Sequence, residues 1–67
     1  MARAEQKAPE GKFRVIGVDT FDGTDWIDGD FDTAEEAINH ARQRGGTMLK
    51  MHAYDDRGRH VGEGGTF

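Results

Sequence analysis

The segment from Gly29 to Gly45, GDFDTAEEAINHARQRG, constrains the fold more than any other part of this sequence. It predicts a helix that follows a strand directly. Thr33 is the expected N-cap, because its hydroxyl can accept from the amide of Glu36 while the Glu36 side chain reaches back. Gly45 is the expected left-handed residue after the helix. One face carries mainly small apolar residues at helical spacing: Ala34, Ala37, Ile38 and Ala41. This face should therefore pack closely on a sheet.

Two strands are expected before this helix. Residues 12–21, KFRVIGVDTF, carry apolar side chains on both faces, which is typical of a central strand. Residues 22–24, DGT, supply turn chemistry. The returning strand, residues 25–31, has two alternating sets: Trp26, Asp28 and Asp30 on one side, and Ile27, Gly29 and Phe31 on the other. We expect Ile27 and Phe31 to face the core.

Two more strands are expected after the helix. The third strand alternates Leu49, Met51 and Ala53 with Lys50, His52 and Tyr54. Its first set should point inward. The DDRG sequence that follows fits a three-residue hairpin loop with Gly58 in the left-handed conformation. Closing the hairpin there places Tyr54 opposite His60 and Ala53 opposite Val61.

This order of elements predicts an α+β fold, a two-layer ββαββ domain with a four-stranded antiparallel sheet and one helix packed on one face. Residues 12–63 should form the single domain, with a thin core because the chain has only 67 residues. Residues 1–11 are polar and show no periodicity, so we expect a disordered N-terminal tail. Residues 64–67 should form a flexible C-terminal tail.

Composition excludes several classes of function. The chain has no cysteine, so it has neither disulfides nor thiolate-based zinc sites. Its net charge of -4 argues against a nucleic-acid partner, because phosphate binding requires a basic surplus. The first residues, MARAEQKAPEGK, contain no apolar stretch long enough for a signal peptide or a membrane span. We therefore expect a soluble, cytoplasmic protein that needs no cofactor.

The second face of the predicted sheet has no layer to cover it. Five residues are assigned to this face as the candidate binding surface: Arg14, Trp26, His52, Tyr54 and His60. An exposed patch of this kind favours a protein partner or self-association, with a homodimer as the simplest case. Trp26 with Tyr54 could instead stack single-stranded nucleic acid, but the neighbouring aspartates oppose this interpretation.

The helix sequence FDTAEEAINHARQRG followed by MLKMHAYDDRGR resembles short bacterial ββαββ domains of unknown function. Those domains combine an FxTxEEAxxxA helix with a YDDxGR-type hairpin. The resemblance covers about the last fifty residues and implies the same arrangement of strands and helix. It implies no activity, and no functional residue is carried over from it.

The alternative function is binding of a divalent cation, calcium or magnesium, by acidic residues. The candidate ligands are Asp22, Asp25, Asp28, Asp30 and Asp32. The DGDFD sequence resembles the start of an EF-hand loop, in which carboxylates alternate. Two positions depart from that loop, because Thr33 replaces the sixth-position glycine and Asn39 replaces the twelfth-position glutamate.

The three histidines provide no complete site. His52 and His60 could be diagonal neighbours on the uncovered face, but two ligands do not make a metal centre. On the helix, Glu36 is the expected partner of His40. Acid-base catalysis by His52 or His60 with Tyr54 is disfavoured, since a domain this small has little room for a pocket that excludes water. We expect a non-enzymatic interaction or self-association module.

Overall fold

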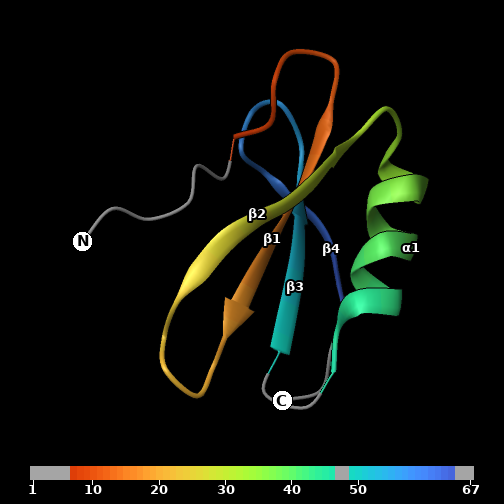
Figure 1. Ribbon diagram of the computed structural model, residues 1–67. Helices are drawn as coiled ribbons and strands as arrows, with labels where there is room; N and C mark the ends of the chain where they lie inside the picture. The colour runs from red at the N-terminus through yellow and green to blue at the C-terminus, as the bar shows by residue number, and fades with distance from the viewer. Residues whose placement is uncertain (1–6, 47–48, 65–67) are drawn as a thin grey trace.

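The computed structural model describes residues 7–46 and 49–64. Its elements are β1 (Phe13–Asp19), β2 (Asp25–Phe31), α1 (Ala34–Arg44), β3 (Leu49–Tyr54) and β4 (His60–Gly64). The four strands form one antiparallel sheet in the order β2-β1-β3-β4, and α1 lies on one side of it (Figure 1). The predicted two-layer ββαββ fold is confirmed, and β1 is a central strand as its sequence indicated.

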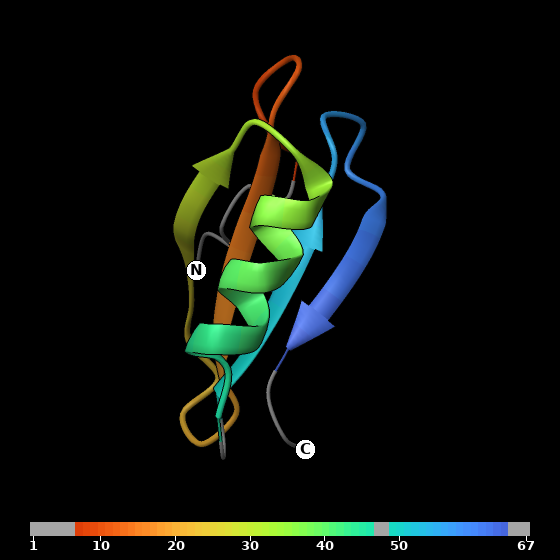
Figure 2. The ribbon, with the colours of Figure 1, turned by 90° about the vertical axis from the view of Figure 1, so that its right-hand side faces the viewer.

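The helix gives the sheet two different faces. Figure 2 shows α1 in front of the central strands β1 and β3, with β2 and β4 on either side. We call the face under α1 the covered face and the opposite one the open face. Strand pairing assigns these residues to the open face: Arg14, Ile16, Val18, Asp25, Ile27, Asp30, Lys50, His52, Tyr54, His60 and Glu63. Ile16 is only 3% exposed, yet it is not part of the hydrophobic core, because it lies on this second face.

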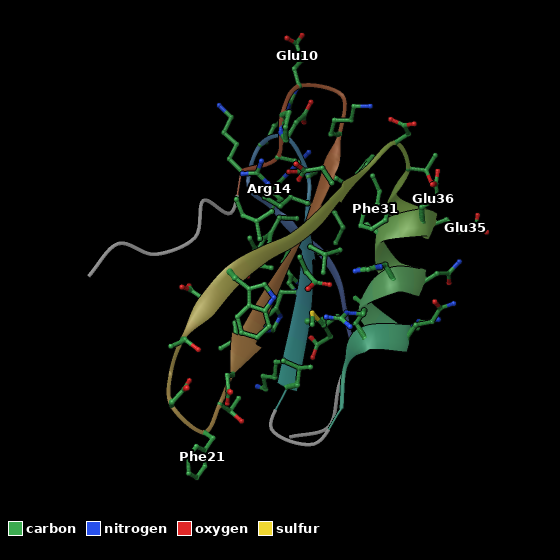
Figure 3. All side chains as sticks on the ribbon, viewed as in Figure 1. Glu10, Arg14, Phe21, Phe31, Glu35 and Glu36 are labelled. Carbon is green, nitrogen blue, oxygen red and sulfur yellow. The ribbon has the colours of Figure 1, made fainter. Side chains whose placement is uncertain are left out.

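The core lies between α1 and the covered face. Its fully buried members are Val15, Ala37, Ala41, Met51 and Ala53. Phe31 is half-buried against this cluster and points toward α1 (Figure 3). The alanines let the helix approach the sheet so closely that a Cβ at Gly64 would overlap the carbonyl of Ala41.

The two ends of α1 differ in how well the sequence predicts them. At the start, the Thr33 hydroxyl accepts a 3.1 Å hydrogen bond from the Glu36 amide and donates to the Glu36 carboxylate. The N-cap is confirmed. The prediction of a left-handed residue at Gly45 is wrong, since this residue is extended with φ -66° and ψ 146°. The chain instead turns at Gly46, which exchanges backbone hydrogen bonds with Leu49 in both directions.

The β3–β4 hairpin has the predicted turn. Gly58 has a φ of 80°, and its amide donates to the Asp55 carbonyl at 3.0 Å. Tyr54 pairs with His60 as expected. The predicted pairing of Ala53 with Val61 is wrong, because the register shifts at this point and Gly62 lies opposite Ala53.

Each edge strand contains one extra residue that bulges from the ladder. In β2 the extra residue is Asp28, because Val15 pairs with Gly29 and the next residue, Ile16, pairs with Ile27. In β4 it is Val61. Simple alternation therefore holds only on one side of a bulge. Side chains beyond the bulge lie on the face opposite to the one that alternation predicts.

Part of the expected N-terminal tail packs on the hairpin. Ala8 is 3% exposed, and its amide donates to the Asp55 carbonyl at 3.1 Å. The Gly11 amide donates to the Asp56 carboxylate. The ordered structure thus begins before residue 12, and Gly64, expected in the C-terminal tail, ends β4 as a buried residue. The rest of the two predicted tails, residues 1–6 and 65–67, lies outside the described residues.

Candidate functional site: two histidine clusters on opposite faces

Four of the five predicted binding residues lie on the open face. Arg14, His52, Tyr54 and His60 occupy three adjacent strands there. Arg14 projects to the side opposite α1 in Figure 3. Its guanidinium pairs with Asp30, with 2.7 Å between Nε and Oδ1, so it is held at the β1–β2 border of this face.

Trp26 lies on the covered face, which contradicts the sequence prediction. It pairs with Gly17, whose partner on the other side is the core residue Met51. Its indole ring covers Gly17 so closely that a Cβ there would lie 2.5 Å from the ring. The bulge at Asp28 is the cause, because it exchanges the faces of the residues that precede it. Ile27 is consequently 46% exposed on the open face and does not face the core.

Asp28 is the centre of a polar cluster under the helix. Its carboxylate is 8% exposed and receives a 3.0 Å hydrogen bond from Trp26 Nε1. His40 Nε2 lies 2.5 Å from Oδ2, and Arg44 Nε donates to the same oxygen at 3.3 Å. Burial alone would raise the pKa of Asp28, but the hydrogen bonds from Trp26, His40 and Arg44 outweigh it and lower the pKa.

The Asp28 cluster has a structural explanation. It joins β2 to α1, and its donors satisfy a carboxylate that would otherwise be buried without partners. The expected partner of His40 was Glu36, whereas the observed partner comes from a strand twelve residues earlier. The ring of Phe31 packs on His40 with 4.8 Å between ring centres, which fixes the imidazole further.

The open face carries a second histidine cluster. His52 Nδ1 and His60 Nε2 are 3.2 Å apart. His60 Nε2 lies 3.9 Å from a carboxylate oxygen of Glu63. The Tyr54 ring meets His60 edge-on at 5.5 Å and His52 at 6.3 Å between centres. The two imidazoles and the Glu63 carboxylate therefore lie close together beside the Tyr54 ring.

Glu63 belongs to this cluster only because of the bulge at Val61. Residues 60 and 63 are three apart, so a regular strand would point them to opposite faces. The extra residue restores them to the same face and places Glu63 directly opposite His52. No role was predicted for Glu63, because the glycines of residues 62–65 disfavour a regular strand. No local pattern in HVGEG marks the bulge.

The environment of the open-face cluster changes two pKa values. Burial is the main reason why the pKa of His52 is lowered, and His60 and Lys50 lower it further while Glu63 opposes them. Burial and the charge of Glu63 raise the pKa of the Tyr54 phenol. The lowered pKa favours the neutral form of His52, in which one ring nitrogen has a lone pair available.

The acidic residues of the alternative function do not converge. Asp28 lies under the helix, Asp30 pairs with Arg14, and Asp32 pairs with Lys12. Asp22 accepts from Thr24 within the β1–β2 turn. Among residues 7–46 and 49–64, the one group of three or more potential ligands close enough to share an ion consists of His52, His60 and Glu63.

Comparisons with other proteins found no relative of this chain. No known protein family, curated protein or solved structure matches this chain. Within the described residues, α1 is eleven residues long, and no helix has the length and apolar character needed to cross a membrane. The geometry of the two faces is therefore the basis for proposing a function.

Proposed function

We propose that this chain is a small, cytoplasmic, non-enzymatic module that self-associates through the open face of its sheet. The observation that carries the proposal is the apolar strip formed by the exposed Ile27 and the half-buried Val18 at the β1–β2 side of that face, beside Ile16, which is already buried. Ile27 is 46% exposed, and in the described strands it is the one large hydrophobic side chain that is exposed. Covering this strip would remove apolar surface from water, which favours association.

A second copy of the chain fits this face better than a partner of a single charge. Charges of both signs flank the strip: Arg14 and Lys50 are positive, and Asp25 and Asp30 are negative. A two-fold axis brings a patch against itself, so a patch with both signs can pair its opposite charges. The net charge of -4 opposes a nucleic-acid partner.

The shape of the domain also favours contact between faces. Its principal extents are 32 × 27 × 15 Å, so the domain is flattened. Both edge strands contain a bulge, at Asp28 and Val61, and bulged edges disfavour pairing of strands from separate molecules.

The test is light scattering coupled to size exclusion over a concentration series, with one variant and a matched control. Ile27→Asp introduces a charge into the strip, whereas Phe21→Asp introduces the same charge at the tip of the β1–β2 turn. Phe21 is 79% exposed and points away from the domain in Figure 3. We expect a dimer that Ile27→Asp converts to a monomer and that Phe21→Asp leaves intact.

Two results would contradict self-association through this face. One is a monomeric mass for the unsubstituted chain at every concentration. The other is a dimer that Ile27→Asp leaves unchanged. Circular dichroism of both variants checks that the fold is retained, which we expect because both side chains are exposed.

A further inference from the structure

We propose that His52, His60 and Glu63 form a binding site for a first-row transition-metal dication, with zinc as its most suitable occupant. All three ligands come from one chain and lie at the β3–β4 side of the open face, whereas the apolar strip lies at its β1–β2 side. Zinc binding is therefore tested on the monomer. It differs from the calcium or magnesium alternative in its residues and in its chemistry. Imidazole nitrogens suit zinc, copper and nickel, whereas calcium and magnesium prefer an all-oxygen site.

The distances between the ligand atoms match such a site. A tetrahedral zinc ion with bonds of about 2.0–2.1 Å to nitrogen holds two ligand atoms about 3.3 Å apart. His52 Nδ1 and His60 Nε2 are already 3.2 Å apart. The three ligand atoms all lie within 4.8 Å of one another. For all three ligand atoms to contact one ion, the exposed Glu63 side chain must move by about 1 Å.

The backbone holds these three residues in a fixed relation. His52 and Glu63 are directly paired across β3 and β4, and His60 follows the hairpin turn at the start of β4. The bulge at Val61 directs both His60 and Glu63 to the open face. Bulges of this kind recur beside functional sites, where they re-aim a side chain.

The site is open to solvent on one side and supported on the other. The side chains of His60 and Glu63 are 42% and 49% exposed, so an ion can reach them. The half-buried Tyr54 ring packs against His60. Three protein ligands leave a position for water, which is the coordination of an open zinc site. Lys50 acts against a cation, and the carboxylate of Glu63 offsets this charge.

The competing interpretation is a hydrogen bond between the two imidazoles with no ion. In that case one ring donates its N–H to the other and Glu63 is a surface carboxylate. The two interpretations differ in whether the chain binds a metal and in whether Glu63 contributes. Both differences can be measured.

The experiment is isothermal titration of the full chain, without a histidine tag, with ZnCl2 at neutral pH. It is done at a protein concentration at which light scattering shows a monomer. We expect one ion per chain with a Kd of about 10 µM or lower. Cobalt(II) should give visible absorption bands at the same stoichiometry. His60→Asn and Glu63→Gln should each weaken zinc binding at least about 10-fold.

Two control variants separate this site from other ligands. Glu35→Gln changes a carboxylate on the outer side of α1, which points to solvent in Figure 3. His40→Asn removes the histidine of the other cluster. Both should bind zinc as the unsubstituted chain does. Circular dichroism of His60→Asn and Glu63→Gln should show an unchanged fold, because both side chains are exposed. The same measurement checks His40→Asn, in which Asp28 keeps Trp26 and Arg44 as donors.

Three results would overturn the site. The first is the absence of saturable zinc binding by the monomer up to 100 times the expected Kd. The second is binding that His60→Asn and Glu63→Gln leave unchanged, which would place the ion elsewhere. The third is that Glu35→Gln and His40→Asn, while folded, weaken zinc binding as much as His60→Asn and Glu63→Gln do. None of these results bears on self-association, which Ile27→Asp tests separately.

Discussion

The two edge strands use the same local device with opposite results. In β2 the bulge at Asp28 sends a carboxylate under the helix, where Trp26 and Arg44 donate to it and His40 lies 2.5 Å away. In β4 the bulge at Val61 sends Glu63 to the open face, where its carboxylate is 49% exposed and 3.9 Å from His60. A histidine beside a carboxylate is therefore a structural link where a helix covers it and a potential ligand set where no helix or strand of the described residues does.

The largest effect should come from closing the narrow gap between the helix and the covered face. Gly64→Ala adds a Cβ that would overlap backbone atoms of Ala41 and Arg42. We expect a loss of about 3 kcal/mol in the free energy of unfolding, because backbone cannot move aside as a side chain can. Gly46→Ala is the control, since a Cβ there meets nothing within 4 Å. Thermal denaturation measures both, and equal stability of the two variants would contradict this packing.

A smaller loss should follow from removing the charge of the covered carboxylate. Asp28→Asn leaves His40 and Arg44 without an anionic partner. We expect the free energy of unfolding at pH 7 to fall by about 2 kcal/mol. Urea denaturation measures it, with Glu35→Gln, whose side chain points to solvent in Figure 3, as the control. A loss below that of the control would show that Asp28 does not link β2 to α1.

The same carboxylate should make stability depend on acidity. The pKa of Asp28 is lowered in the folded chain, so the unfolded chain binds this proton first as the pH falls. The stabilisation is complete above the unfolded pKa of about 3.9 and is lost as the pH falls through the lower folded pKa. Groups facing it are Trp26 on β2 and His40 and Arg44 on α1. Urea denaturation between pH 5 and pH 2 should show a steeper loss in the unsubstituted chain than in Asp28→Asn.

The smallest effect on stability should come from the matching change on the open face. Glu63→Gln removes a carboxylate that is 49% exposed. In the presence of a chelator we expect the free energy of unfolding to change by no more than about 0.5 kcal/mol. Urea denaturation beside Asp28→Asn gives the comparison directly. A loss as large as that of Asp28→Asn would mean that the open-face cluster also supports the fold.

The features that the sequence predicts correctly depend on local chemistry. Thr33 caps the helix, Gly58 permits the hairpin turn, and Met51 and Ala53 face the core, each for a reason contained within a few residues. These local signals were sufficient for the ββαββ fold. The placement of Arg14 and Tyr54 on the uncovered face follows from simple alternation, because β1 and β3 have no bulge between these residues and the core.

The wrong predictions of side-chain placement result from the two bulges. Alternation placed Trp26 on the open face and Ile27 in the core, and the extra residue at Asp28 exchanges them. No face was predicted for Glu63, and the bulge at Val61 places it on the open face. An extra residue is favoured by contacts with α1 and with the neighbouring strand, and these contacts are distant in sequence. The partner of His40 depends on the same long-range packing.

The placement of Trp26 gives each face its own spectroscopic reporter. The chain has one tryptophan and one tyrosine. The indole donates to Asp28 beneath the helix, whereas the phenol ring packs on His60 at the uncovered surface. Emission excited where only indole absorbs therefore follows the packing of the helix, and the tyrosine bands of second-derivative ultraviolet spectra follow events at the other face. The unmodified protein can thus distinguish loosening of its interior from occupation of its surface without any added label.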